Sequence, residues 1–530
     1  MVRNRRMGPR MAQNEKDALI LGTEKISTLL WKFSLPAIVA MVASSLYNII
    51  AGVFISDLGA YTISGVSLTM PFMNMAAAFG ALVGVGASVV CSISLGQKDY
   101  AKARRTLANL IILNLVLGIG FSVVGLVFLD PILLLLGASE NTLQPAHEFM
   151  QIILFGNVFA HMYLGMNSVI RVSGYPGTAM GLTLVSVAIN LGLAPLFIYV
   201  FEWGVQGAAL ATVVAQVVCC IILVVLFENP SRTVYIDKRE FRLDGEIVKR
   251  SFFIGSPNFC TNAVACIVVT FINHALLDYG GEYSDLYPGA YNIVNRIGML
   301  FFLIVLGFSQ GMQPIVAYNY GAKKYHRLWG TLKLTLICAT CVTTLGTLIC
   351  ELFPEFITSI FVSPKSPNDI RLAEITVTGF RILMMAFWII SVQVIGSNFL
   401  ASINQPMKSL VLSLTRQLIF LLPALFILPQ YLGVHGVWLS IPISDVLAAV
   451  AAGFVVWRTW KSYEPRVRST TEAEPFDAAS SAERAAISAD CAAISTELAA
   501  ISADRATIST DCAAIPETTS ADSNVLRTAE

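Results

Sequence analysis

Residues 95–100, which read Leu-Gly-Gln-Lys-Asp-Tyr, return 225 positions later as residues 320–325, Tyr-Gly-Ala-Lys-Lys-Tyr. The match extends outward in both directions, and Gly86 falls on Gly311 in the same register. The more distant matches pair Ser34-Leu35-Pro36 with Gly255-Ser256-Pro257, and residues 203–207 with residues 432–436. The chain is therefore a tandem repeat of two similar halves.

Both halves are apolar enough to lie in a membrane. Hydrophobic residues make up 55% of the 530 residues and charged residues only 13%, whereas soluble domains carry about 25% charged residues. Stretches of membrane-spanning length, about 20 apolar residues, occur from near Leu29 to near Val456. We predict an all-α integral membrane protein with twelve transmembrane helices in two pseudo-symmetric six-helix lobes. The helix centres are expected near residues 42, 76, 115, 160, 188, 216, 264, 304, 340, 387, 419 and 446.

The composition divides the chain into five segments. We expect an N-terminal segment (1–27), an N-lobe (28–228), a polar connector (229–249), a C-lobe (250–460) and a tail (461–530). In the tail a seven-residue unit recurs, beginning with residues 485–491, Ala-Ala-Ile-Ser-Ala-Asp-Cys. Such a repeat is open to a coiled-coil interpretation, but its Ser, Thr and Asp are mediocre helix formers. We favour a disordered, low-complexity tail that transport does not need.

The distribution of basic residues predicts the orientation. Lys and Arg cluster before the first helix, between helices 2 and 3, in the connector, between helices 8 and 9, and after helix 12. With twelve crossings all these clusters fall on one side, and basic loops stay in the cytoplasm. We therefore expect a multi-pass protein of a bacterial cytoplasmic membrane with both termini cytoplasmic.

Motifs of soluble enzymes are missing. The sequence has no phosphate-binding Gly-x-x-x-x-Gly-Lys-Ser/Thr motif and no Gly-x-Ser-x-Gly elbow. His147-Glu148 begins like a zinc-protease helix, but Gln151 stands where the second histidine is needed. The spacing of Cys338 and Cys341 is explained by packing in apolar surroundings. We expect no catalysis, no metal and no cofactor, and no nucleic-acid partner.

Several motifs carry a resemblance to a known family. Residues 46–50 read Leu-Tyr-Asn-Ile-Ile, residues 311–322 read Gly-Met-Gln-Pro-Ile-Val-Ala-Tyr-Asn-Tyr-Gly-Ala, and Asn190 precedes Pro195 by five positions. Residues 207–212, Gly-Ala-Ala-Leu-Ala-Thr, add to these. Over residues 28–458 the pattern resembles the multidrug and toxic compound extrusion (MATE) family of secondary antiporters, bacterial type. The resemblance implies a V-shaped pair of lobes with cargo between them, and export driven by protons or sodium ions.

The sequence departs from that family at an important place. In many prokaryotic relatives helices 1 and 5 each supply an acid to an N-lobe cation site, and the matching positions here are Ala51 and Ala194. The other polar positions implied by the resemblance remain, as Asn167, Asn190 and Thr212. Since alanine offers neither a titratable group nor an oxygen ligand, we expect no carboxylate coupling in the N-lobe, and coupling to H⁺ rather than Na⁺.

Asp445 is the candidate coupling residue in place of those acids. It lies near the middle of predicted helix 12, opposite Gln216 in the repeat, where a charged side chain costs about 2.5–3.5 kcal/mol even on the mildest scale. A proton, a cation or a paired base must neutralise it, and we expect Arg296 of helix 8 to be its charged neighbour. Arg416 and Arg171 are expected to extend to the cytoplasmic interface. Gln313 is a candidate for lining the cleft.

Three functions are compatible with these features. The leading hypothesis is a monomeric, cation-coupled antiporter that exports small amphipathic organic compounds across the bilayer. An alternative is an exporter or flippase for an anionic or zwitterionic metabolite or lipid-linked precursor, which the excess of intramembrane arginines would suit. A second alternative is a membrane receptor or scaffold without transport, against which the prolines and loop glycines in both lobes argue.

Overall fold

The computed structural model describes residues 20–362 and 367–473. In these ranges the ordered elements are helices, and no strand is assigned. The chain divides into two compact units, Met1–Val467 and Arg468–Glu530. Of the second unit, only the end of the last helix lies within the described residues, so the rest of the predicted tail lies outside them.

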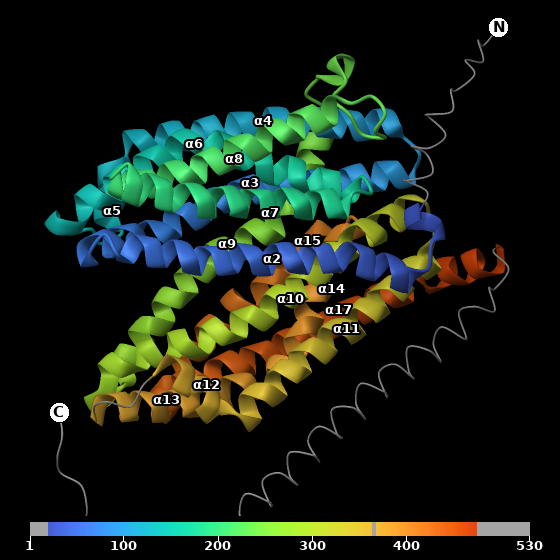
Figure 1. Ribbon diagram of the computed structural model, residues 1–530. Helices are drawn as coiled ribbons and strands as arrows, with labels where there is room; N and C mark the ends of the chain where they lie inside the picture. Colours follow the sequence, from blue (N-terminus) through green and yellow to red (C-terminus); the bar gives the residue numbers. More distant parts are fainter. Residues whose placement is uncertain (1–19, 363–366, 474–530) are drawn as a thin grey trace, which may run out of the picture. The chain divides into compact units, whose positions relative to one another are not determined.

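The first half of the chain forms a bundle of six long helices, coloured blue to green in Figure 1. Its core packs α3 against α4 and α6 through buried Val83, Leu107 and Met166. The short α5 (Leu129–Leu135) follows α4. The long helices are α2 (Ile26–Ser56), α3 (Ala60–Gly96), α4 (Tyr100–Val127), α6 (Glu140–Val172), α7 (Pro176–Pro195), which the π-helix η1 (Leu196–Val200) extends, and α8 (Gly204–Glu228).

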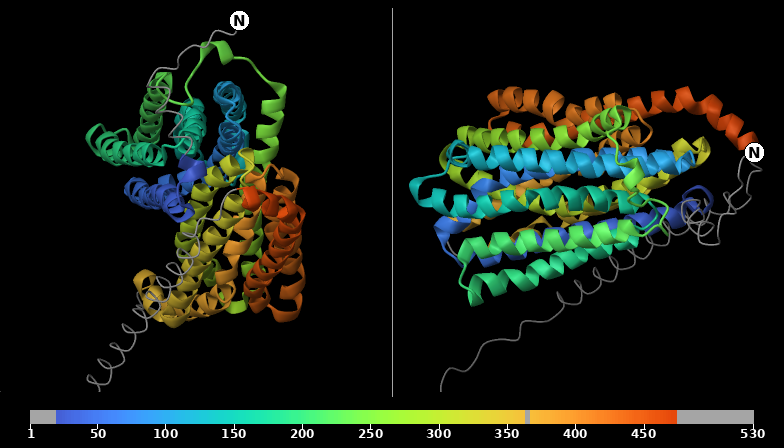
Figure 2. Two further views of the ribbon diagram at one scale, coloured as in Figure 1. Left: turned by 90° about the vertical axis from the view of Figure 1, so that its right-hand side faces the viewer. Right: turned by 90° about the horizontal axis from the view of Figure 1, so that it is seen from above.

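The second half repeats this arrangement, with its first long helix in light green and the later ones in yellow to red (Figures 1 and 2). Its core joins Val294, Leu332 and Phe399. Shorter elements are η2 (Lys238–Glu240), η3 (Gly281–Leu286) and α12 (Pro354–Phe361). The long helices are α9 (Gly245–Tyr279), α10 (Tyr287–Gly321), α11 (Tyr325–Leu352), α13 (Pro367–Met384) with η4 (Phe387–Ile389) and α14 (Ile390–Ser402), α15 (Pro406–Leu414) with η5 (Thr415–Leu421) and α16 (Leu422–Leu432), and α17 (Val434–Ala473).

The predicted fold class is confirmed. Within the described residues, eleven helices are long and apolar enough to cross a membrane, and the number is twelve if α13 with η4 and α14, a pair bent by 41°, is taken as one span. The helices differ most from the expected boundaries at the C-terminal end. There α17 continues past residue 460 to Ala473, because Tyr463 and Val467 pack against the core of the C-lobe.

The repeat is visible in the backbone itself. Lys98 and Lys323, which are equivalent in the two halves, both have φ of 60°, a left-handed conformation that is uncommon for residues other than glycine. It reverses the chain between α3 and α4 and again between α10 and α11. These turns lie at the same end of the molecule as residues 20–25 and the connector, and we call this end the basic side.

The two lobes touch on the basic side through glycines. A Cβ atom on Gly96 would lie 2.1 Å from the carbonyl oxygen of Tyr318, and one on Gly321 would lie 2.2 Å from that of Ile93. Ile93 and Tyr318 are themselves 225 residues apart, so α3 and α10 cross by the same contact made twice. The glycines are required here because only a missing side chain lets the two backbones approach so closely.

Candidate functional site

Polar side chains of the N-lobe lie along α7, where the buried Asn167 and Asn190 bond to half-buried hydroxyl groups, and we call this set the N-lobe polar cluster. The amide nitrogen of Asn190 donates to Thr212 Oγ1 at 3.3 Å, and Tyr47 Oη lies 3.4 Å from the same hydroxyl. Two turns earlier on α7, Thr183 accepts a hydrogen bond from Asn167 at 3.3 Å. The structure thus brings together Asn190 and Thr212, two of the predicted residues. Asn167, the third, lies on α6 and bonds to α7 at Thr183.

The cluster leaves acceptor capacity unused. Asn167 and Asn190 are 6% and 4% exposed, and the carbonyl oxygen of each side chain has no hydrogen-bond partner among the described residues. Ala194, four residues after Asn190, is buried, and Ala51 is half-buried. Neutral amide and hydroxyl oxygens can hold a polar group by hydrogen bonds, but they offer no carboxylate to a proton or a cation.

The C-lobe holds a buried ion pair. Asp445 on α17 is 3% exposed, and its Oδ1 accepts a hydrogen bond of 2.6 Å from Nε of Arg416. Arg416 lies within the π-helix η5, and its guanidinium carbon also lies 5.9 Å from the centre of the Phe302 ring. A π-helix has an extra residue in its turn and is frequent at functional sites. Burial makes this pair costly to separate.

The predicted partner of Asp445 was wrong. Arg296 is exposed on α10, and Arg416, which we expected to extend to the membrane interface, takes its place. The physical reason is proximity: η5 and α17 belong to consecutive membrane helices, and their packing places Arg416 beside Asp445. The sequence does hold a signal for this pair, since an acid and a base stand on neighbouring apolar helices.

The remaining predicted residues lie elsewhere. Gln313 on α10 donates to Asn398 Oδ1 of α14 at 3.1 Å, which joins two helices of the same lobe. Gln216 is half-buried on α8 in the other lobe from Asp445. The predicted residues therefore separate into an N-lobe polar cluster, a C-lobe ion pair and a contact between α10 and α14.

Arg171 and Gln310 form a contact between the lobes that the sequence does not predict. The guanidinium of Arg171, at the end of α6, donates to the side-chain oxygen of Gln310 on α10. No carboxylate lies within ion-pair distance of Arg171 among the described residues. Both residues stand out in apolar helices, but nothing in the spacing of the sequence pairs them, because they lie 139 residues apart in different lobes.

An all-helical chain with two repeats, membrane-length helices and polar sites inside both lobes has the build of a secondary transporter. Comparison with family models identifies the kind of transporter. The MatE model matches residues 36–196 and 262–426, more than half of the chain. The protein belongs to the MatE family of multi-pass membrane transporters, which confirms the resemblance read from its motifs.

Individual relatives agree with this assignment. The chain is 27% identical over 434 residues to the multidrug export protein MepA of Staphylococcus haemolyticus, and the match covers 80% of this chain and 92% of that protein. The MepA of Staphylococcus aureus strain NCTC 8325 gives the same identity and coverage.

Two solved structures share the fold. An outward-facing multidrug resistance MATE transporter superposes with a TM-score of 0.79 at 24% identity, covering 84% of this chain and 98% of that one. A transporter of the same superfamily from Pyrococcus furiosus, described by the reverse polarity of its binding pocket, has the same TM-score and identity and covers 85% and 99%.

Proposed function

We propose that this protein is a proton-coupled antiporter that exports amphipathic organic compounds from a bacterial cytoplasmic membrane. The observation that carries the proposal is the buried pair of Asp445 and Arg416, whose Nε and Oδ1 atoms lie 2.6 Å apart. The multidrug export proteins among the relatives support the choice of cargo. Orientation with both termini in the cytoplasm follows from the basic loops.

In the proposed cycle the proton binds a carboxylate oxygen of Asp445. The neutral acid no longer compensates the charge of Arg416, so the guanidinium is released to solvent or to cargo. Separating a buried pair costs about 3–5 kcal/mol, whereas one charge crossing 100 mV supplies about 2.3 kcal/mol. Because the pair re-forms later in the cycle, the net driving force is the proton gradient, to which each unit of pH difference adds about 1.4 kcal/mol per proton.

Sodium is the weaker choice of coupling ion. Hard oxygen ligands, carboxylates above all, bind cations of this kind, and the N-lobe cluster offers only amide and hydroxyl oxygens from Asn167, Asn190 and Thr212. Ala51 and Ala194 remove the two carboxylates that the family resemblance places there. We therefore assign the coupling step to the C-lobe pair.

A second candidate is export of an anionic or zwitterionic compound. It is favoured by Arg171, which lies between the lobes and donates a hydrogen bond to the neutral Gln310. A cationic side chain without a nearby acid attracts a negatively charged group of a cargo. In this case Arg171 would bind the cargo, while Asp445 would keep its role as proton carrier.

Transport by everted membrane vesicles separates the candidates. Vesicles with this protein should accumulate the organic cation tetraphenylphosphonium when the interior is acidic, and Asp445→Asn should abolish the dependence on the pH gradient. Asp278→Asn, which changes an exposed carboxylate at the end of α9, is the matched control and should transport like the parent. Accumulation of fluorescein but not of the cation would establish the second candidate.

A further inference from the structure

Two short helices lie at equivalent positions of the two halves. α5 (Leu129–Leu135) follows α4, and α12 (Pro354–Phe361) follows α11. Leu129 and Pro354 are 225 residues apart, which is also the offset between the two turns on the basic side. Since α4 and α11 begin at those turns, both short helices lie at the opposite ends of these spans (Figure 1). Each lobe therefore carries the same element at the end away from the basic side.

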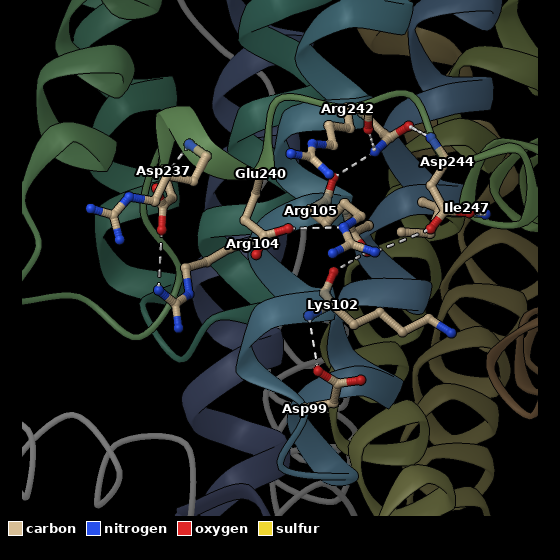
Figure 3. A network of polar contacts seen from close by, with 12 residues as sticks. Asp99, Lys102, Arg104, Arg105, Asp237, Glu240, Arg242, Asp244 and Ile247 are labelled. Atoms are coloured by element: carbon tan, nitrogen blue, oxygen red, sulfur yellow. Dashed lines mark hydrogen bonds and ion pairs between the residues drawn. The ribbon is translucent and has the colours of Figure 1, made fainter. Parts of the chain in front are cut away.

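The start of α4 is fixed on the basic side by charged contacts with the connector (Figure 3). Arg105 donates to Glu240 at 2.9 Å, and Arg104 lies 3.6 Å from Asp237. Charged groups of this kind stay in water or among the lipid headgroups, because they are costly to place in the hydrocarbon region. The first turns of α4 therefore mark the level of the membrane surface on the basic side.

The lengths of α4 and α11 place their other ends at the opposite membrane surface. Helix α11 also begins among polar contacts, since Lys324 donates to the carbonyl oxygen of Gly22 at 3.1 Å. Each of the two helices has 28 residues, which corresponds to about 42 Å, or about 40 Å with a tilt of about 20°. A bilayer is about 40–45 Å thick with its headgroup regions and about 30 Å without them. The short helices that follow thus begin at the level of the headgroups.

An exposed apolar stripe runs along each of these spans and continues past its end. The stripe consists of Val116, Val123 and Val127 on α4 and of Leu345, Leu348 and Leu352 on α11. Val127 and Leu352 are repeat counterparts, and each is 67% exposed. Residues at this spacing lie on one side of a helix, and an exposed apolar side of a membrane span contacts lipid chains. The next residues, Phe128 and Phe353, are exposed as well, so the lipid-facing surface leads directly into the short helices.

Helix α12 has a buried face, an exposed polar face and an exposed apolar face. In that order, the faces consist of Pro354 with Ile357 and Thr358, of Glu355 with Ser359, and of Phe356 with Ile360. Residues four apart share one side of a helix, so Phe356 and Ile360 point away from the protein together. Large apolar side chains beside a polar face are typical of a helix that lies in the plane of a membrane surface.

Helix α5 is divided in the same way. Leu133 is buried in a small core that α5 shares with α6. Leu135, the counterpart of Ile360, is 87% exposed. Asp130 stands where α12 has its acid, and its Oδ1 lies 2.6 Å from Nδ1 of His147 on α6. The acid thus holds one side of α5 to the lobe, while the other side presents an apolar residue outward.

We propose that α5 and α12 are interfacial helices that insert Leu135, Phe356 and Ile360 among the lipids of the leaflet opposite the basic side, at the boundary between headgroups and acyl chains. Neither helix contains Lys or Arg, so the insertion is driven by apolar contact and not by attraction to anionic headgroups. Each lobe is thereby anchored at this surface by a helix of its own. The headgroup layer is polar, so side chains there stay accessible to reagents from the aqueous side.

Nitroxide labels on the purified full chain in phosphatidylcholine vesicles test this placement. In a background with the native cysteines replaced, single cysteines carry the label at Leu135, Phe356 or Ile360, and at Ser359 or Glu140 as matched controls. Ser359 lies on the polar face of α12, and Glu140 is exposed in the first turn of α6 at the same end of the molecule. The measurement compares collisions of each label with oxygen, which dissolves in acyl chains, and with a water-soluble nickel chelate.

The three labels on the apolar faces should have a ratio of oxygen to nickel collisions several-fold above that of the two controls. Because all five positions are exposed, every variant should melt at the parental temperature. Equal ratios at Ile360 and its neighbour Ser359 would overturn the placement. Replacing half of the phosphatidylcholine by phosphatidylglycerol should leave the ratios unchanged, and a rise with the anionic lipid would overturn the assignment to apolar insertion.

Two other occupants of the apolar faces would give different results. If a second copy of the chain covered them, protein labelled only at Ile360 would show a distance between labels that disappears on dilution with unlabelled protein. If the two short helices covered each other, labels at Leu135 and Ile360 of one chain would lie in contact. Either result would overturn the contact with lipid, whereas labels that lack both distances and collide readily with oxygen support it.

Discussion

Nε of Arg416 and Oδ1 of Asp445 lie 2.6 Å apart in the interior of the C-lobe, and Asp445 is 3% exposed. The two residues belong to different membrane helices, so their charges hold η5 against α17. A pair of this kind contributes less to stability than the loss of either partner suggests, because a single substitution leaves the other charge buried and uncompensated. That asymmetry gives the first prediction.

Asp445→Asn and Arg416→Gln should each destabilise the protein by about 3–5 kcal/mol, toward the lower value because the Arg416 side chain is 23% exposed. The double variant should recover a large part of this loss, since it leaves no buried charge. Thermal melts of the purified single and double variants give the coupling energy. Losses that simply add would show that the charges act independently.

The close approach of α3 and α10 gives a second prediction. Gly96→Ala and Gly321→Ala each place a Cβ little more than 2 Å from a carbonyl oxygen of the other lobe, and overpacking of this kind costs about 1–3 kcal/mol. Both variants should melt earlier than the parent. They should also shift the lobes apart on the basic side, which labels at the two turns would detect.

Gly120→Ala is the control for these variants. It changes a glycine within α4 whose Cβ would meet nothing within 4 Å. Because alanine is the better helix former by about 1 kcal/mol, this variant should melt at the parental temperature or slightly above. Equal effects of Gly96→Ala and Gly120→Ala would mean that the lobes do not meet at Gly96.

The sequence predicted the fold because its signals are local or repeated. Two signals can be read without knowledge of packing: the apolar runs of membrane length, and the repeat of residues 95–100 at 320–325. Both are present in the structure, where Lys98 and Lys323 share the same backbone conformation. The boundary of α17 depends instead on tertiary contacts. Tyr463 and Val467 pack on the C-lobe core, which prolongs a helix beyond the point where the composition changes.

The site was predictable in its residues but not in its pairings. Asp445 stands out as an acid in an apolar helix, and Asn190 and Thr212 follow from the family pattern. The pairing of Asp445 with Arg416 instead of Arg296 depends on how the helices pack. The contacts of Arg171 with Gln310 and of Arg105 with Glu240 join residues more than 130 positions apart. Such contacts emerge only when the helices are packed.

The N-lobe cluster gives a prediction about ions. Since Ala51 and Ala194 leave no carboxylate beside Asn190 and Thr212, a Na⁺ gradient without a pH gradient should not energise transport into vesicles. Asn190→Ala should weaken cargo binding or stability, because it removes the bond to Thr212, but should leave the response to Na⁺ unchanged. Uptake driven by Na⁺ alone that Asn190→Ala abolishes would refute the assignment of coupling to the C-lobe.

The basic loops give a prediction about orientation. Ser231 is exposed in the connector, on the side that the basic residues place in the cytoplasm. In intact cells a membrane-impermeant maleimide should not label Ser231→Cys in a background without other reactive cysteines. Leu135→Cys, exposed at the end of the short helix α5, should be labelled. Labelling of the first variant and not the second would invert the topology.

The end of α17 gives a prediction about truncation. A chain that stops after Ala473 retains Tyr463, which packs on Tyr325 with ring centres 5.6 Å apart and accepts a hydrogen bond from Gln405 at 3.4 Å. It should therefore transport and melt like the parent. A chain that stops after Lys461 loses these contacts and those of Val467, on the order of 2 kcal/mol of apolar burial. Its melting temperature should fall although most of the last membrane span remains. A normal melt would show that the extension of α17 does not stabilise the C-lobe.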